Sequence, residues 1–102
     1  MAFVTKVRPY TQITLDLTNP RANAAQGTVA ILGNAVDAWK ANTITFLSLG
    51  GGTLSFRLNN SAAGLITASD GLRVEGEVFS EIYWTHSAQV GKAAEIHIAW
   101  VD

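Results

Sequence analysis

The feature that most constrains the fold is an alternation of apolar and polar residues that recurs along the 102-residue chain. The segments "QITLDL" (12–17), "TLSFRL" (53–58) and "EIHIAWV" (95–101) each place large apolar side chains on one face and polar or small ones on the other. A period of two is typical of β-strands that bury one face. The sequence therefore predicts strands in these segments.

The segment "VFSEIYWT" (78–85) carries large side chains on both faces. In an unbroken strand, Val78, Ile82 and Trp84 share one face, and Phe79 and Tyr83 share the other. We therefore predict a single strand over 77–85 that is covered on both sides.

Turn-forming residues separate the apolar runs at short intervals. They lie at 18–27, 32–34, 50–52, 59–64, 69–71 and 87–92. A strand about every 8–12 residues is the spacing of sandwiches and barrels. Strands are predicted near 3–7, 12–17, 28–32, 43–49, 53–58, 64–67, 72–75, 77–85 and 94–101. The predicted fold is an all-β, antiparallel β-sandwich of jelly-roll type with about eight strands, in one domain over 1–102.

Two segments fit this pattern less well. Residues 1–27 carry both prolines and few large apolar groups after Leu17, and 18–27 is predicted as a loop or arm. The N-terminal segment is either an extended arm that contacts a neighbouring subunit or a plain surface loop. The segment "NAVDAWKAN" (34–42) is predicted as strand or loop with a short helical turn.

Charge and cysteine content exclude several classes of function. Charged residues make up only 15% of the chain, against about 25% in typical soluble domains. Either another subunit covers part of the surface, or the exterior is polar but uncharged. The seven basic residues are scattered, which argues against nucleic acid as a partner. The absence of cysteine excludes disulfides and thiolate chemistry, and no apolar run is long enough for a signal peptide or a membrane span.

No motif for catalysis or for a cofactor stands out. The triple glycine at 50–52 is followed by a strand pattern without the lysine of a phosphate-binding loop, so we interpret it as a bend between two paired strands. His97 is predicted on a surface or interface, and His86 at a turn. Both would have to meet a carboxylate to bind a metal. Glu75, Glu77 and Glu81 would share one side of an unbroken strand and are interpreted as solvated or paired with basic residues. No cofactor, metal or catalytic residue is predicted, and the protein is expected not to be an enzyme.

The aromatic residues are the candidates for contact with a ligand or partner. Trp84 and Trp100 alternate with core-facing isoleucines and are predicted in the core. Trp39 and Tyr10 are the predicted ligand or interface contacts, with ordinary burial as the alternative for Trp39.

The second half of the chain resembles a known group of proteins. "LSFRLNNSAAGLITASDGL" is followed by "GEVFSEIYWTHSAQVGKAAEIHIAWV". A strand leads through an Asn/Ser/Ala turn to "DG". A strand of the form I-Y-hydrophobe-T follows, then "AQVGK" and a final apolar strand. Over about residues 43–101, this order resembles small structural proteins of tailed bacteriophages.

The resemblance implies a β-sandwich placed on the virion, as a capsid decoration (cement) protein or a tail or fibre accessory. The expected partners are further copies of the chain, with a trimer as the first expectation, and the major capsid protein or tail proteins. The expected location is the virion, assembled in the host cytoplasm without a secretion signal. The alternative is a module that binds a carbohydrate or receptor, such as a glycan of the host surface.

Overall fold

The computed structural model describes residues 10–27 and 41–99, and of Tyr10 and Thr11 the backbone alone. These residues form eight strands. The strands are β1 (Tyr10–Asp16), β2 (Arg21–Gly27), β3 (Ala41–Ser48), β4 (Ser55–Leu58), β5 (Ile66–Thr67), β6 (Arg73–Phe79), β7 (Glu81–His86) and β8 (Ala93–Ala99). They pair antiparallel in two sheets. The prediction of an all-β antiparallel sandwich is confirmed.

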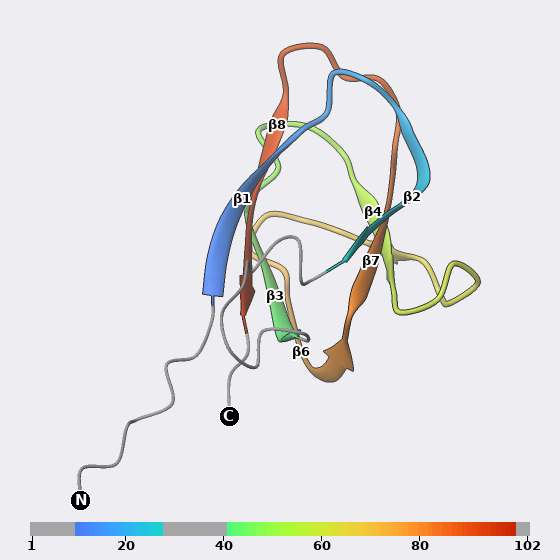
Figure 1. Ribbon diagram of the computed structural model, residues 1–102. Helices are drawn as coiled ribbons and strands as arrows, with labels where there is room; N and C mark the ends of the chain where they lie inside the picture. Colours follow the sequence, from blue (N-terminus) through green and yellow to red (C-terminus); the bar gives the residue numbers. More distant parts are fainter. Residues whose placement is uncertain (1–9, 28–40, 100–102) are drawn as a thin grey trace, which may run out of the picture.

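The two sheets have a nested strand order. The order in the first sheet is β1-β8-β3-β6 and in the second β2-β7-β4-β5. The first strand thus pairs with the last, the second with the seventh, the third with the sixth and the fourth with the fifth (Figure 1). The chain is arranged like one long hairpin folded over itself, so most pairings join residues far apart in the sequence.

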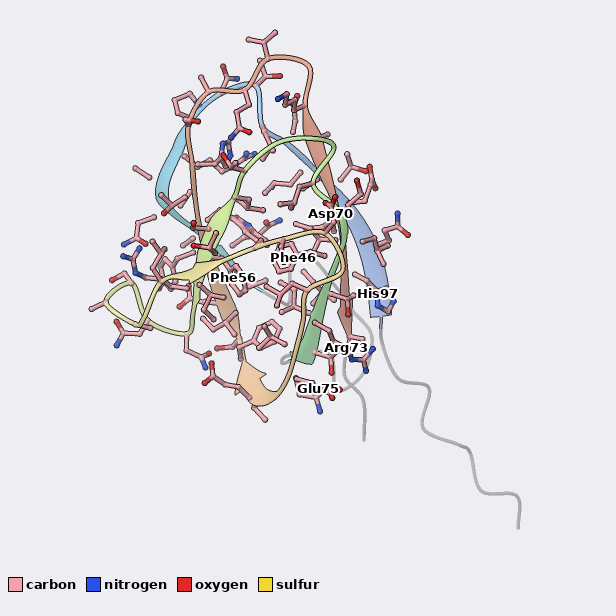
Figure 2. The ribbon with its side chains drawn as sticks, turned by 180° about the vertical axis from the view of Figure 1, so that it is seen from behind. Phe46, Phe56, Asp70, Arg73, Glu75 and His97 are labelled. Carbon is pink, nitrogen blue, oxygen red and sulfur yellow. The ribbon has the colours of Figure 1, made fainter. Side chains whose placement is uncertain are left out.

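The core lies between the sheets and is centred on three aromatic rings. Phe46 comes from the first sheet, and Phe56 and Trp84 come from the second. The centroids of Phe46 and Phe56 are 4.9 Å apart, and Trp84 meets Phe46 edge-on at 6.4 Å. All three side chains are almost fully buried, and Figure 2 places the two phenylalanines in the interior. The predicted inward faces of 53–58 and of Trp84 are confirmed.

Nearly every connection crosses from one sheet to the other, because only β4 and β5 follow each other within a sheet. The triple glycine therefore joins strands of different sheets. The prediction of a bend between two paired strands is wrong, because β3 and β4 do not pair with each other. The triple glycine is nevertheless a tight turn: Gly52 N donates to Leu49 O at 2.9 Å, and Gly50 and Gly51 have φ values of 61° and 80°.

The single strand predicted over 77–85 is wrong. The strand is interrupted at Ser80. There the chain passes from β6 of the first sheet to β7 of the second. This change resets the alternation: Phe79 is buried and Val78 is exposed, whereas Ile82 and Trp84 face the core. β7 therefore buries one face, whereas in β6 only Phe79 is buried, and the large groups of the segment belong to two different sheets.

Asn59 fixes this corner. Its Nδ2 donates to Val78 O at 2.8 Å, and its Oδ1 accepts from Ser80 N at 2.9 Å. Its own N–H donates to Glu81 O at 2.8 Å. The side-chain amide thus takes the place of a backbone peptide where the ladder is interrupted.

The loop predicted at 18–27 is also wrong, because Arg21–Gly27 form β2 at the edge of the second sheet. Ala24, Ala25 and Gln26 pair with β7, after a register shift that follows Arg21. The small side chains of this segment gave no apolar alternation from which a strand could be predicted. Gln26 Oε1 accepts a hydrogen bond from Trp84 Nε1 at 2.8 Å, which ties β2 to β7. A contact of residues 1–27 with a neighbouring subunit stays a prediction.

Some predicted elements fall outside the described residues: the strands at 3–7 and 28–32, the helical turn within 34–40, and Trp100. The single domain over 1–102 also stays a prediction. In the part of the chain that is described, no helix is long and apolar enough to cross a membrane.

Candidate functional site

The two predicted contact residues are not brought into a site by the described structure. Tyr10 is the first residue of β1, where its backbone pairs with Ala99. Its side chain and the whole of Trp39 lie outside the described part. Their role in binding therefore stays a prediction.

His86 has the structural role that its place at a turn predicts. It ends β7 and is buried, with Nδ1 2.7 Å from Ser87 O and Nε2 2.8 Å from Nη1 of Arg21. Since the guanidinium can only donate, Nε2 is the acceptor and Nδ1 carries the proton. The same Nη1 donates to Asp16 O at 2.7 Å, so Arg21 and His86 join the ends of β1 and β7.

His97 lies on the outer face of the first sheet, as its position between two buried isoleucines predicts. Figure 2 shows it on the same flank as Arg73 and Glu75. Those two side chains form an exposed ion pair of 3.0 Å. Within residues 10–27 and 41–99, no three His, Asp or Glu side chains gather in a group that could hold a metal.

The predicted common side for the three glutamates is wrong. Glu75 pairs opposite Thr43 in the first sheet, whereas Glu81 begins β7 in the second. Between them Gly76 has a φ of 93°, and the regular register of β6 with β3 ends after Glu75. The acids are therefore spread over two sheets and do not form a paired carboxylate site.

The end of the sandwich that carries the triple glycine is tied by Gln89. Its Oε1 accepts from Thr53 N at 2.7 Å, and its Nε2 donates to Thr53 O at 2.8 Å. Lys92 Nζ donates to Gly51 O at 3.0 Å, and Gly91 has the positive φ of 76° expected of a turn. These contacts tie the turn before β8 to Thr53 and to the triple glycine.

The described residues contain one surface that combines an outward aromatic ring with charged groups. Tyr83 points outward from β7, because its neighbours Ile82 and Trp84 point into the core. By register, Ala25 of β2 lies opposite it on one side and Arg57 of β4 on the other. Glu81, two residues earlier in β7, lies on the same face. We call these four residues the Tyr83 face.

Hydrogen bonds fix the charged groups of the Tyr83 face. Tyr83 Oη donates to Glu81 Oε1 at 3.2 Å. Arg57 donates from Nε to Ala63 O and from Nη1 to Asn23 Oδ1, both at 2.9 Å. Asn23 Nδ2 in turn donates to Ser61 O at 2.9 Å. The guanidinium thus ties the loop after β4 to the edge strand β2.

The environment of Tyr83 favours its neutral form. Partial burial raises the pKa of the Tyr83 phenol above its ordinary value, and the hydrogen bond and negative charge of Glu81 raise it further. The phenol is therefore a hydrogen-bond donor to Glu81 at neutral pH.

Sequence reasoning missed the Tyr83 face, although a signal for it was present. Tyr83 alternates with Ile82 and Trp84, which predicts an outward ring once the strand is known to begin at Glu81. The assumption of an unbroken strand covered on both sides hid this signal.

Comparison of the chain with protein-family models, with curated proteins and with solved structures gave no match.

Proposed function

We propose that the chain is a non-enzymatic structural protein of a phage virion, most simply a capsid decoration protein that self-associates and binds the capsid surface. The observation that carries the proposal is the nested strand order. A jelly roll would have eight strands in two packed sheets, and jelly rolls recur in viral capsid and lectin domains, so the strand order supports this proposal.

The composition supports a surface that is covered in an assembly. With only 15% charged residues, the chain has the depletion of charge that marks interface cores. Several large apolar side chains of the described residues are exposed: Leu47, Leu65, Val78 and Val90. The last of these is 82% exposed at the tip of the turn before β8. Burial of such side chains between copies contributes to association.

Size-exclusion chromatography with light scattering on the full chain tests self-association. We expect a whole multiple of the mass of one chain, with three as the first expectation, since self-association usually gives a closed homo-oligomer. A mass of one chain at the highest concentration that stays soluble would contradict the proposal.

A second candidate function is carbohydrate binding, because lectin domains are among those that have the jelly-roll architecture proposed here. The residues predicted for it, Trp39 and Tyr10, have no described side chains. The Tyr83 face supports this candidate at a different position.

A further inference from the structure

The Tyr83 face offers a flat ring beside small neighbours. On the side of edge strand β2, the residue opposite Tyr83 is the exposed Ala25, and the residue opposite Glu81 is Gly27. Neither carries a side chain beyond Cβ that could cover the phenol. The face of an aromatic ring is electronegative and attracts the positively polarised C–H groups of a ligand laid on it.

Two charged groups flank the ring with unused hydrogen-bonding capacity. Arg57 uses Nε and Nη1, and no described residue accepts from its Nη2, which keeps two N–H donors. Glu81 accepts from Tyr83 at Oε1, and no described residue donates to its Oε2. The guanidinium is held by the loop after β4, so its direction is fixed before a ligand binds.

These groups select a class of ligand. One positive and one negative charge next to the same ring favour neither an anion nor a cation. A donor and an acceptor that both flank one ring match different hydroxyl groups of a ligand laid on it, because hydroxyls both donate and accept. A ring with an apolar C–H face and a hydroxylated edge combines both requirements, and a neutral pyranose has this form.

We propose that the Tyr83 face binds a terminal neutral hexopyranose, stacked on Tyr83 with hydroxyls on Arg57 Nη2 and Glu81 Oε2. This inference rests on the second candidate function and does not depend on self-association. A site with one stacked, half-buried ring gives weak binding, so the expected Kd is on the order of 1 mM.

Titration of the 15N-labelled full chain with D-galactose, D-glucose and D-mannose tests the proposal. With up to about 50 mM sugar, which exceeds the expected Kd, at least one sugar should shift the backbone amides of Ala25, Arg57 and Tyr83. If none of the neutral sugars shifts these amides, the proposal is wrong.

Two pairs of variants distinguish the effect of losing or covering the ring from the effect of disturbing the fold. Tyr83→Phe keeps the ring and should bind within about fivefold of the wild type, whereas Tyr83→Thr keeps a good strand former without the ring and should lose the shifts. Ala25→Leu places a larger side chain opposite the ring and should also lose them. Its matched control is Ala22→Leu, at an exposed alanine of the same strand that does not pair opposite Tyr83.

Three outcomes overturn the site. The first is sugar binding that survives both Tyr83→Thr and Ala25→Leu. The second is sugar binding that Ala22→Leu removes as fully as Ala25→Leu does. The third is that the same amides shift with protein concentration in the absence of sugar. The last result would assign the face to a second copy of the chain. A monomer by light scattering that still binds sugar would contradict only the proposed self-association.

Discussion

At the scale of single residues, two neighbouring glycines are required for different physical reasons. Gly50 and Gly51 both have positive φ, which a side chain disfavours. A Cβ added to Gly50 would in addition overlap the backbone oxygen of Ala93, whereas one added to Gly51 would meet no atom within 4 Å. The conformation requires glycine at both positions, but close packing against β8 requires it only at Gly50.

Alanine substitutions at these two positions separate the two effects. Gly51→Ala should lower the free energy of unfolding by about 1–2 kcal/mol, the cost of left-handed backbone for a residue with Cβ. Gly50→Ala should cost about 1–3 kcal/mol more, because backbone atoms of β8 must move. Urea unfolding measures both, and equal losses would mean that the contact with Ala93 is unimportant.

The ionisation of Asp16 makes the stability of the folded chain depend on pH. Hydrogen bonds from Thr18, first from its side chain and then from its backbone N–H, lower the pKa of the Asp16 carboxyl below its usual 3.8. Partial desolvation opposes this, and the charge of Arg21 adds a smaller lowering. Since the folded state prefers the ionised form, the contribution of Asp16 to stability is present above the ordinary pKa and is lost as the pH falls through the folded one.

The Asp16→Asn variant should show this loss in urea unfolding at several pH values. Above a pH of about 5 the wild type should be more stable than the variant, and the difference should shrink as the pH falls below the ordinary pKa. Asparagine can still accept the hydrogen bond from Thr18 N, so the variant tests the charge rather than the bond. A stability difference that is independent of pH would contradict this account.

At the scale of elements, the turn between β7 and β8 holds the neighbouring connections. Gln89 N donates to Leu17 O at 2.8 Å, and its side-chain amide pairs with both backbone groups of Thr53. Leu17 follows β1 and Thr53 precedes β4. One glutamine therefore joins connections from three separate parts of the chain.

Gln89→Ala should loosen this end without unfolding the sandwich. The amide of Thr53 loses its acceptor, so its hydrogen exchange should accelerate by roughly tenfold or more, which corresponds to a bond of about 1–1.5 kcal/mol. Val90→Ala in the same turn is the control, because Val90 is largely exposed and should leave the exchange unchanged. Equal exchange in Gln89→Ala and wild type would show that the turn stands without the side chain.

The strands could be predicted from the sequence where they carry their own apolar alternation. The segments 12–17, 43–49 and 53–58 match β1, β3 and β4 to within a few residues. β2 could not be found, because "RANAAQG" has no large apolar residue and is a strand only through its pairing with β7. The break at Ser80 was equally hidden, since a side chain far away in sequence, Asn59, fixes that corner.

At the scale of the whole molecule, the two sheets depend on one shared core. Phe46 of β3 packs against Phe56 of β4, and both contact Trp84 of β7. The inward direction of these rings could be predicted from alternation, but the partners across the core could not, because alternation carries no information on which strands share a sheet. The Tyr83 face was missed for the related reason that its three strands meet only in the fold.

Phe56→Leu should therefore weaken the molecule as a unit. Removal of part of a fully buried ring should cost about 1–3 kcal/mol. Tryptophan fluorescence and far-ultraviolet circular dichroism should report the same lowered urea midpoint, because the sheets share the core. Separate midpoints for the two signals would contradict a single cooperative unit.

The position of β8 has a consequence for biosynthesis. β8 pairs with β1 on one side and β3 on the other, so the first sheet lacks its second strand until residues 93–99 are available. A ribosome-bound chain that ends before β8 has both neighbours present with nothing to join them. The sandwich must therefore form late, after nearly all of its residues have left the exit tunnel.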